Sequence, residues 1–330
     1  MNRIPAISII IPTRNSAPTL LACLKAIERS TVVAHEIIVV DDGSSDGSGE
    51  IAEAEGVILV KLNGNRHANY CRNVGAEHAS GDILLFLDSD VVLQPDTIRN
   101  ALDSLSNGRC DVVVGLYSDR HVHPNVASQY KNLWIRYSYL RSRENVDWIF
   151  GAIALIRKQA FHNAGGFDRT LFRNKGGDLE LGKRITDVHP SIVLNPRVEV
   201  EHLKKHVLTT LLRNDFDRAQ GFLQLAGRLG QLSRSLFKGF ANVYPAFVYS
   251  SAIVWLMLLS LMAGVWIPSV LWSAIGFSIL YLILNADFLL YYARHRGYDK
   301  MPQVLGVMVL DHLACGAGSL MGLSRWLFSR

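Results

Sequence analysis

Two aspartates one residue apart, Asp88 and Asp90, are the residues best suited to chemistry in this chain of 330 residues. They follow residues 83–87, an unbroken apolar run that predicts a buried β-strand. Open α/β sheets bind ligands beyond the carboxyl ends of their strands. Two carboxylates crowded there repel one another unless a cation is present, and hard divalent cations prefer carboxylate oxygens. The pair therefore indicates a metal site, with a solvated turn as the alternative for an Asp-x-Asp taken alone.

Further apolar runs predict the elements that must position this pair. The runs are rich in β-branched residues and cover 7–11, 36–40, 57–61 and 83–87. Helix-like segments lie between them, near 19–29, 48–54 and 69–79. This alternation predicts a parallel sheet covered by helices on both faces. Three of the strands end in polar clusters, namely Thr13-Arg14-Asn15, Asp41-Asp42-Gly43-Ser44-Ser45 and Asp88-Ser89-Asp90. Parallel strands would bring all three clusters to one edge of the sheet.

The composition of the chain limits the classes of protein to which it can belong. The chain is 49% hydrophobic with a mean hydropathy of +0.17, which is high for a purely soluble enzyme, and its length predicts about two domains. The net charge of +5 comes without a basic stripe interleaved with aromatics, so a nucleic-acid partner is not expected. The four cysteines are far apart, as in reduced cytosolic proteins. A dinucleotide-dependent oxidoreductase is excluded because no G-x-G-x-x-G follows the first strand.

The hydrophobic character is concentrated near the C-terminus and predicts a membrane region over residues 241–330. Residues 243–264 contain no charge, and 265–292 form a second apolar run. Each exceeds the ~20 residues that a helix needs to cross a bilayer. Two buried core helices are the alternative, which the lack of a charged face disfavours. Residues 4–12 are too short for a secretory signal and continue into the first strand.

Flanking charges predict how this region is oriented. Basic residues before and after the two spans place both ends on the cytoplasmic side as a hairpin; they are Arg228, Arg234, Lys238, Arg294, His295, Arg296 and Lys300. A third apolar segment, 304–328, carries Asp311 and His312 and ends in arginines. A full crossing would place those arginines outside, so a re-entrant or interfacial helix is favoured over a third span.

The segment before the membrane region has a different pattern. Residues 206–240 alternate leucine and phenylalanine with lysine and arginine. This pattern is typical of amphipathic helices that lie in the membrane interface with a basic face towards anionic headgroups. Helices that pack on the preceding domain are the alternative.

Taken together, the motifs of residues 1–205 resemble those of inverting family 2 glycosyltransferases with the GT-A fold. Six motifs and a final histidine carry the resemblance, in the family's order: residues 9–15, 37–48, 71–75, 88–90, 165–168 and 177–181, and then His202. The resemblance implies an α/β catalytic domain with a Rossmann-like, mostly parallel sheet, followed here by an α-helical membrane region. It also implies transfer of a sugar from a nucleotide-diphospho-sugar, UDP-linked in the first instance, at the cytoplasmic face of the cell membrane.

The resemblance further implies which residues bind the donor. Asp42 matches an aspartate that accepts a hydrogen bond from the nucleobase, typically uracil, although it could instead stabilise an Asx-type turn. Arg72 would face the nucleotide, where its fixed donors suit a ring carbonyl or a phosphate. The full predicted donor-binding set is Pro12, Thr13, Arg14, Asp42, Arg72, Asp88 and Ser89.

Asp90 is the predicted metal ligand. Asp88 would lie nearer the ribose or reach the metal through water, and His202 matches a histidine that completes such metal sites. A structural histidine after a strand is the alternative for His202. Mn²⁺ or Mg²⁺ would bridge the two phosphates and offset the charge of the leaving diphosphate. Oxygen ligands do not separate these two ions.

Asp178 is the predicted general base, because family members place an aspartate here that deprotonates the acceptor hydroxyl. They typically carry Glu-Asp; this chain has Gly177 instead, which makes Glu180 a second candidate. An N-capping role is the alternative for Asp178. One carboxylate suffices for inverting displacement.

A base also predicts the acceptor, since a polyprenyl phosphate is already ionised and needs none. The expected acceptor is therefore a hydroxyl on a lipid-linked glycan or a lipid. A polyprenyl-phosphate glycosyltransferase and a non-catalytic nucleotide-binding membrane protein remain as alternatives. Residues 126–140, with Trp134, Tyr137 and Tyr139, form either part of an acceptor wall or an aromatic core stripe.

Overall fold

In a computed structural model of the protein, the chain divides into two compact units. Unit 1 comprises Met1–Val122 and Leu140–Lys204, and unit 2 comprises His123–Tyr139 and Lys205–Arg330. The structure describes residues 5–64, 66–106, 108, 110–169, 176–188, 192–228, 230 and 245–328. Helix α5 (Val126–Leu140) follows strand β6 of unit 1 in the sequence, yet nearly all of it belongs to unit 2.

Unit 1 is built on a sheet that has eight strands within the described residues. Their spatial order is β3-β2-β1-β4-β7-β6-β8-β5. The strands are β1 (Ile7–Thr13), β2 (Glu36–Asp41), β3 (Ile58–Lys61), β4 (Ile83–Leu87), β5 (Val91–Leu93), β6 (Val112–His121), β7 (Ile153–Arg157) and β8 (Ile192–His202). Parallel pairing joins β1 to β2 and β4, β2 to β3, and β6 to β8, whereas β7 runs antiparallel to β4 and β6. The prediction of a mostly parallel α/β sheet is confirmed.

The helices of unit 1 cover both faces of this sheet, as the apolar strands require. β1 and β4 are buried at every position, which matches their unbroken apolar sequences. The helices are α1 (Ala17–Glu28), α2 (Ser48–Ala54), α3 (Ala68–His78), α4 (Thr97–Ser106), α6 (Lys158–Asn163) and α7 (Gly177–Val188). α3 approaches β1 closely because Gly75 has no side chain: a Cβ there would lie 2.3 Å from Cγ2 of Ile10.

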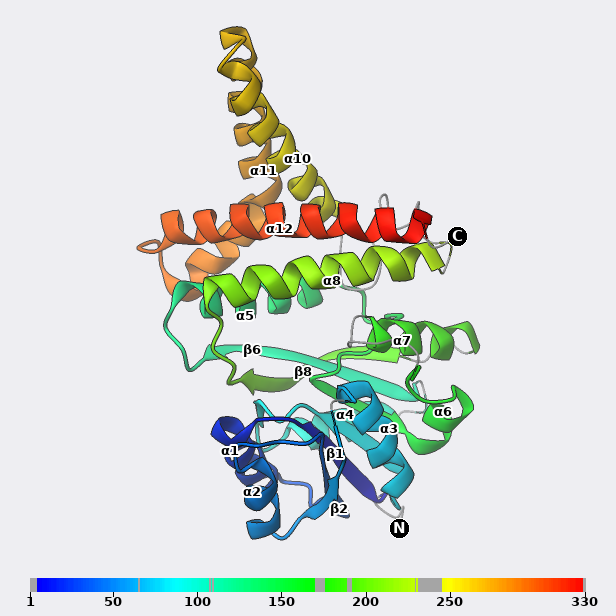
Figure 1. Ribbon diagram of the computed structural model, residues 1–330. Coiled ribbons are helices and arrows are strands. Elements are labelled where there is room, and N and C mark those ends of the chain that lie inside the picture. Colours follow the sequence, from blue (N-terminus) through cyan, green and yellow to red (C-terminus); the bar gives the residue numbers. More distant parts are fainter. Residues whose placement is uncertain are drawn as a thin grey trace. The chain divides into compact units, whose positions relative to one another are not determined.

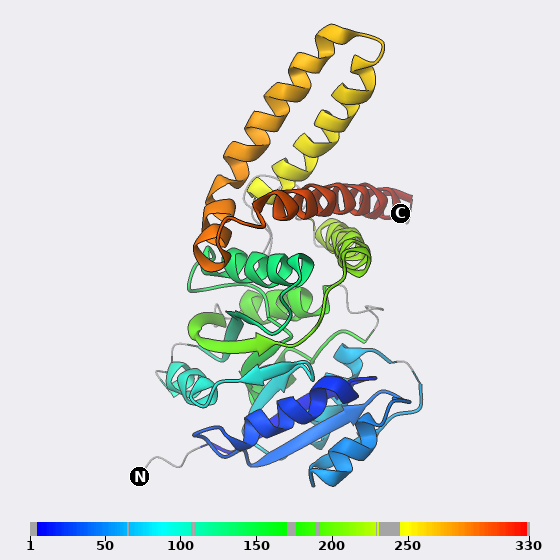
Figure 2. The same ribbon diagram turned by 90° about the vertical axis from the view of Figure 1, so that its left-hand side faces the viewer.

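Unit 2 is helical. Besides α5 it contains α8 (Leu208–Arg228), α10 (Pro245–Gly264), the short 3₁₀ helix η2 (Pro268–Val270), α11 (Leu271–Arg296) and α12 (Met301–Phe328). α10 and α11 form an antiparallel hairpin, and α12 runs crosswise to it, side by side with α8 (Figures 1 and 2). Among the described residues α10, α11 with η2, and α12 are long and apolar enough to cross a membrane.

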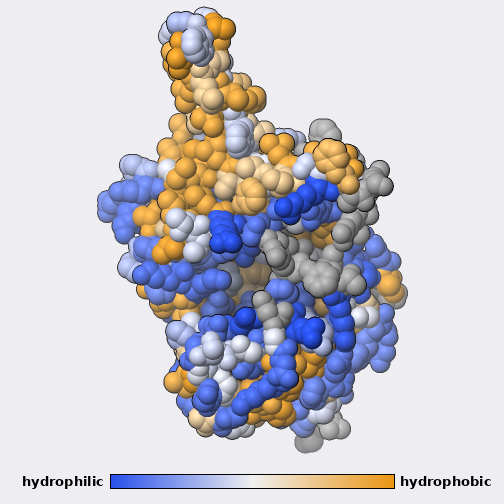
Figure 3. Space-filling model, in the orientation of Figure 1, coloured by the Kyte–Doolittle hydropathy of each residue, from blue (hydrophilic) through white to orange (hydrophobic). Residues whose placement is uncertain are grey.

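The surface of the hairpin is hydrophobic over most of its length (Figure 3). Large apolar side chains are exposed along it, among them Leu259, Met262, Val265, Trp266, Trp272, Ile279 and Ile283. An apolar surface of this kind is unfavourable in water and is typical of contact with lipid. The predicted spans 243–264 and 265–292 correspond to α10 and α11. Arg234 and Lys238, two of the basic residues predicted before the first span, lie outside the described residues.

Aromatic side chains form much of the core of unit 2. Trp134 of α5 packs edge-on against Phe288 of α11, with ring centroids 4.7 Å apart, and Tyr130 and Tyr137 contact the same ring. Trp134, Tyr137 and Tyr139 are each less than a tenth exposed. Of the two alternatives for residues 126–140, the structure therefore supports the aromatic core.

A buried polar cluster lies within this core and consists of Tyr130, Lys131, Asp215 and Asp311. Nζ of Lys131 lies 2.6 Å from Oδ2 of Asp215, and both residues are less than a tenth exposed. The Tyr130 hydroxyl donates to Oδ2 of Asp311 at 2.8 Å, and Asp311 in turn shares a hydrogen bond with Asp215. The cluster ties α5 to α8 and α12. Its members are paired, as buried polar groups must be.

Candidate active site

The three polar clusters predicted at the strand ends lie together at one edge of the sheet. β1 and β2 are in register, with Thr13 opposite Asp41, and the Asp42 amide donates to the Thr13 carbonyl at 2.9 Å. The end of β4 joins them through Ser89, whose hydroxyl donates to the Ser16 hydroxyl at 2.8 Å. Parallel pairing of the central strands thus brings together residues up to 77 positions apart, between Thr13 and Asp90.

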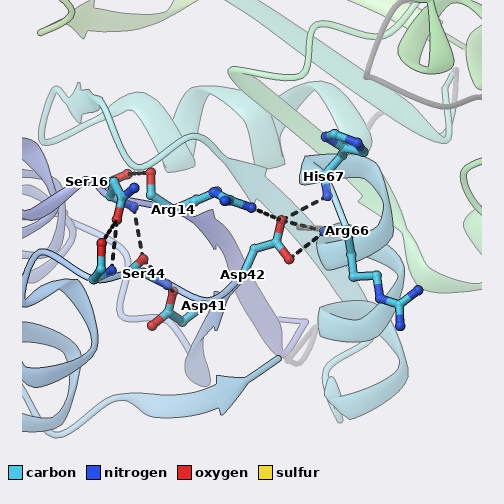
Figure 4. A network of polar contacts seen from close by, with 9 residues as sticks. Arg14, Ser16, Asp41, Asp42, Ser44, Arg66 and His67 are labelled. Atoms are coloured by element: carbon cyan, nitrogen blue, oxygen red, sulfur yellow. Dashed lines mark hydrogen bonds and ion pairs between the residues drawn. The ribbon is translucent and has the colours of Figure 1, made fainter. Parts of the chain in front are cut away.

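Asp42 lies almost fully buried at this edge, with 3% of its surface exposed. Its carboxylate accepts hydrogen bonds from the backbone amides of Arg66, at 2.7 Å, and His67, at 2.9 Å, and lies 3.8 Å from the guanidinium of Arg14 (Figure 4). Asp42 therefore holds the segment that leads into α3. The turn after β2 is stabilised by Asp41 instead, which accepts from the Ser44 amide at 2.9 Å.

The loops after β1 and β2 are tied to each other. The Asn15 amide donates to the Ser44 hydroxyl, and the Ser45 amide donates to Oδ1 of Asn15, each at 2.9 Å. Pro12 and Thr13 are buried within β1 itself. Of the three predicted donor-binding residues at the end of β1, Arg14 is therefore the one that solvent and ligands can reach.

Arg72 is directed at Asp88. Its guanidinium donates to Oδ1 of Asp88 at 2.6 Å, to the Gly151 carbonyl at 3.0 Å and to Oδ1 of Asn69 at 2.7 Å, and the residue is 5% exposed. Burial raises the pKa of the Asp88 carboxyl, Arg72 opposes that rise and the neighbouring Asp90 adds to it. Arg72 thereby fixes Asp88 at the strand end, while about a third of the Asp88 side chain stays exposed.

Asp90 faces His202 of β8. Nε2 of His202 lies 3.5 Å from Oδ2 of Asp90, and the Leu203 amide donates to the Asp90 carbonyl at 2.8 Å. Burial opposes ionisation here, but the hydrogen bond and charge of His202 hold the pKa of Asp90 below its usual range. The ring of Tyr117 stacks on His202, with centroids 4.3 Å apart and planes 8° apart. No motif of the sequence indicated Tyr117.

Asp90 and His202 fit a divalent cation that takes only part of its ligands from the protein. Across the described residues, no group of three or more histidine, cysteine or acidic side chains is arranged to hold a metal ion. A carboxylate oxygen and an imidazole nitrogen face each other across 3.5 Å, however. Mg²⁺ and similar ions are commonly held by one or two side chains together with substrate phosphates and water.

Asp178 lies in the first turn of α7, which begins at Gly177, so it is not an N-cap residue. Its carbonyl accepts from the Ile149 amide at 3.2 Å. A Cβ at Gly177 would lie 2.1 Å from Nδ2 of Asn69, which in turn holds Arg72. The glycine, which stands where the resemblance implies a glutamate, therefore lets α7 approach the contacts that join Asn69, Arg72 and Asp88.

Glu180, the second candidate base, is engaged in an ion pair. Its carboxylate accepts from Arg184, with Oε2 2.7 Å from Nη2, and Arg184 also donates to the Gly166 carbonyl at 2.6 Å. Glu180 thus fixes α7 to the Gly165-Gly166 turn. This ion pair makes Glu180 a weaker candidate for proton transfer than its sequence position alone indicated.

Asn73 has a positioning role that the motif at 71–75 did not by itself reveal. Its side-chain amide donates to the Phe167 carbonyl at 2.8 Å, and its carbonyl accepts from the Phe167 amide at 2.9 Å. This two-point contact holds the backbone of the 165–168 motif against α3. The motifs at residues 71–75 and 165–168, which are far apart in the sequence, therefore contact each other in the fold.

Known glycosyltransferases are similar to this chain in sequence. Residues 8–165 match the model of glycosyl transferase family 2. Glycosyltransferase AglE of Haloferax volcanii is 29% identical over 200 residues, covering 57% of this chain and 64% of AglE. Glycosyltransferase GlyG of Streptococcus pneumoniae is 30% identical over 176 residues, covering 47% of this chain and 58% of GlyG. The matched part is thus less than two thirds of either relative.

Two solved structures share the fold. Mannosyltransferase PcManGT from Pyrobaculum calidifontis, in complex with GDP-Man and Mn²⁺, matches with a TM-score of 0.59 at 19% identity, over 97% of this chain and 88% of that chain. GalNAc-T7 with UDP, GalNAc and Mn²⁺ matches with a TM-score of 0.51 at 14% identity, over 71% of this chain and 52% of that chain. The predicted GT-A fold is confirmed, and residues 8–165 of the chain form a glycosyl transferase family 2 domain.

Proposed function

We propose that the protein is a membrane-bound, inverting glycosyltransferase. It takes a sugar from a nucleotide-diphospho-sugar, UDP-linked in the first instance, and transfers it to a hydroxyl on a lipid-linked glycan or a lipid. The observation that carries the proposal is the single edge at which β1, β2 and β4 end, where Asp90 faces His202 across 3.5 Å.

The donor-binding part of the proposal rests on the residues at this edge. Asp42 and the loops after β1 and β2 would receive the nucleoside, and Asp88, fixed by Arg72, would lie towards the ribose. Asp90 and His202 would hold Mn²⁺ or Mg²⁺ together with the diphosphate. Such a cation, when bound, supplies positive charge that offsets the charge of the departing nucleoside diphosphate.

Asp178 would carry the proton transfer. Its carboxylate removes the proton from the acceptor hydroxyl while that oxygen attacks the anomeric carbon. The bond from this carbon to the diphosphate oxygen breaks on the opposite face, so the configuration inverts. General-base catalysis of this kind contributes roughly 10²–10⁴-fold in rate.

The apolar helices α10 and α11 support attachment to the cell membrane, which would hold the enzyme where lipid acceptors lie. Arg294 and Arg296 lie in the last turn of α11 and Lys300 follows it, and such residues favour the cytoplasmic side. The catalytic unit, which precedes the hairpin, would then also be cytoplasmic.

Calorimetric titration of the solubilised protein tests the donor site. UDP, GDP and dTDP are titrated with and without Mn²⁺, GDP being included because one structural neighbour is a GDP-Man complex. We expect metal-dependent binding of one nucleotide that is lost in Asp90→Ala and kept in Asp103→Ala, a matched change at an exposed position of α4. Metal-independent binding would remove Asp90 from its assigned role. Absence of nucleotide binding would refute the proposal.

Asp178→Asn tests the acceptor class. With a hydroxyl acceptor we expect kcat to fall by roughly 10²–10⁴-fold while nucleotide affinity is unchanged. Activity close to that of the wild type would instead identify an acceptor that is already ionised, such as a polyprenyl phosphate. Glu180→Gln, made in parallel, distinguishes the second candidate base from the first.

A further inference from the structure

We propose that α12 does not cross the membrane but lies in its cytoplasmic headgroup layer, paired with α8. α10 and α11 are then the two membrane spans formed by the described residues. By length and composition α12 qualifies as a third span, which would place the C-terminus on the outer face. The inference rests on the membrane attachment in the proposed function but not on its chemistry.

Close packing joins α12 to α8 along much of their lengths (Figures 1 and 2). A Cβ at Gly318 would lie 2.2 Å from the Phe216 carbonyl oxygen, and one at Gly322 would lie 2.4 Å from that of Gln220. At the other end of the contact, a Cβ at Gly227 of α8 would lie 2.6 Å from the Trp326 indole. The two backbones are therefore in contact over several turns, and wherever α12 lies α8 must lie too.

α8 is too polar to enter the hydrocarbon. Within its 21 residues it carries Arg213, Asp215, Asp217, Arg218 and Arg228. Asp215 is buried against Lys131, but the side chains of Arg213 and Arg218 are exposed on the surface of unit 2. Exposed arginines are strongly unfavourable at the bilayer centre and favourable beside anionic headgroups. The pair of helices therefore belongs in the headgroup layer.

The two faces of α12 agree with this position. The face that carries Asp311, Cys315, Gly318 and Gly322 is buried within unit 2. The opposite face is apolar and exposed, through Leu310, Leu320, Met321, Leu327 and Phe328. Asp311 and His312 are fully buried and thus do not face lipid. α12 thus has an apolar exposed face on one side and the charged helix α8 on the other. This arrangement fits a helix whose apolar face contacts acyl chains while its partner contacts headgroups.

The direction of α12 completes the argument. α12 runs across the hairpin (Figures 1 and 2), and the crossing is fixed by Trp255 of α10. The indole nitrogen of Trp255 donates to the Leu313 carbonyl at 3.2 Å and lies beside the backbone at Gly316. If the hairpin spans the bilayer, a helix that runs crosswise to it lies along the membrane plane.

Cysteine labelling of the full-length protein in intact and opened cells tests the inference. Trp266→Cys marks the hairpin turn and Phe328→Cys marks the end of α12, and the two aromatic residues are similarly exposed, at 86% and 91%. The native cysteines are all buried, so the wild-type protein serves as the unlabelled background. A membrane-impermeant maleimide should label Trp266→Cys in intact cells, but Phe328→Cys only after the cells are opened.

Every other pattern overturns the inference. Labelling of both variants in intact cells would mean that α12 spans the membrane. Labelling of neither in intact cells would mean that the hairpin does not cross, and protection of Phe328→Cys even in opened cells would bury the end of α12 in hydrocarbon. A C-terminal fusion that fluoresces only in the cytoplasm should be bright. None of these readouts uses a nucleotide or an acceptor, so their failure is distinct from failure of the proposed function.

Discussion

Removal of the Lys131 ammonium should destabilise unit 2 far more than an ordinary lysine substitution. Lys131 and Asp215 lie 2.6 Å apart and are 7% and 3% exposed. Burial opposes ionisation of Asp215, but Lys131 and then Arg218 hold the pKa of its carboxyl below the usual range. Lys131→Met leaves that carboxylate buried. Its hydrogen bond with Asp311 remains, and the cation that remains near it among the described residues is the exposed Arg218, at 3.7 Å. Breaking a buried pair in this way costs about 3–5 kcal/mol.

The expected loss can be measured by thermal unfolding of the solubilised protein, followed by tryptophan fluorescence. At roughly 2–4 °C per kcal/mol, the midpoint of Lys131→Met should fall by about 6–20 °C. Lys183→Met is the matched control, because Lys183 pairs with Asp187 on the exposed side of α7 and such pairs contribute about 0–1 kcal/mol. The double change Lys131→Met with Asp215→Leu should regain most of the loss, since no charge is left buried. A Lys131→Met shift no larger than that of Lys183→Met would refute the reasoning.

Three further changes follow from close contacts. Asp311→Asn should leave the unfolding midpoint within a few degrees of the wild type, because its hydrogen bond with Asp215 already requires a proton that an amide can replace; a collapse as large as that of Asp215→Asn would contradict this. Gly177→Glu restores the family's usual residue but should weaken nucleotide affinity in calorimetry, since the new side chain meets Asn69. Gly318→Leu should lower stability by about 1–3 kcal/mol in the same thermal assay, as it forces α12 away from α8.

The first half of the sheet could be predicted because each of its strands has a recognisable pattern in its own residues. β1 and β4 are continuous apolar runs, and the helices between the first four strands begin and end within two residues of the predicted segments. The direction of β7 could not be predicted in this way. β7 lies antiparallel between β4 and β6 because of pairs such as Leu85 with Leu155, which are 70 residues apart. A pairing over that distance leaves no periodic pattern in the sequence around either residue.

The placement of α5 illustrates the same limit. The predicted catalytic domain of residues 1–205 includes residues 126–140. Contacts group most of α5 with the C-terminal helices, since Lys131 and Tyr130 meet partners 84 and 181 residues further along the chain. A polar residue inside an aromatic stripe, as Lys131 is, was the available signal of a distant buried partner.

The motifs predicted that the polar clusters meet at one edge of the sheet, but not the contacts that each residue makes there. Asp88 and Asp90 occupy the predicted strand end, yet the partner of Arg72 is Asp88, and the partners of Asp42 are two backbone amides. Residue types indicate which chemistry is available, whereas the direction of a side chain depends on loops placed by the rest of the fold. Tyr117 left no motif, because stacking on His202 requires only an aromatic ring at the right place on β6.

Hydropathy has an equivalent limit at α12, because it scores a helix by its own residues alone. Gly318 and Gly322 are spaced as in helices that associate within membranes, and the helix is apolar enough to span. That spacing records close approach of two backbones, not the medium around them. Here the partner is α8, which has exposed arginines. Moving α12 into lipid would move these arginines with it, which is unfavourable in free energy. The membrane position of a helix is thus a property of everything packed against it, which is why α12 can score as a span and still lie at the surface.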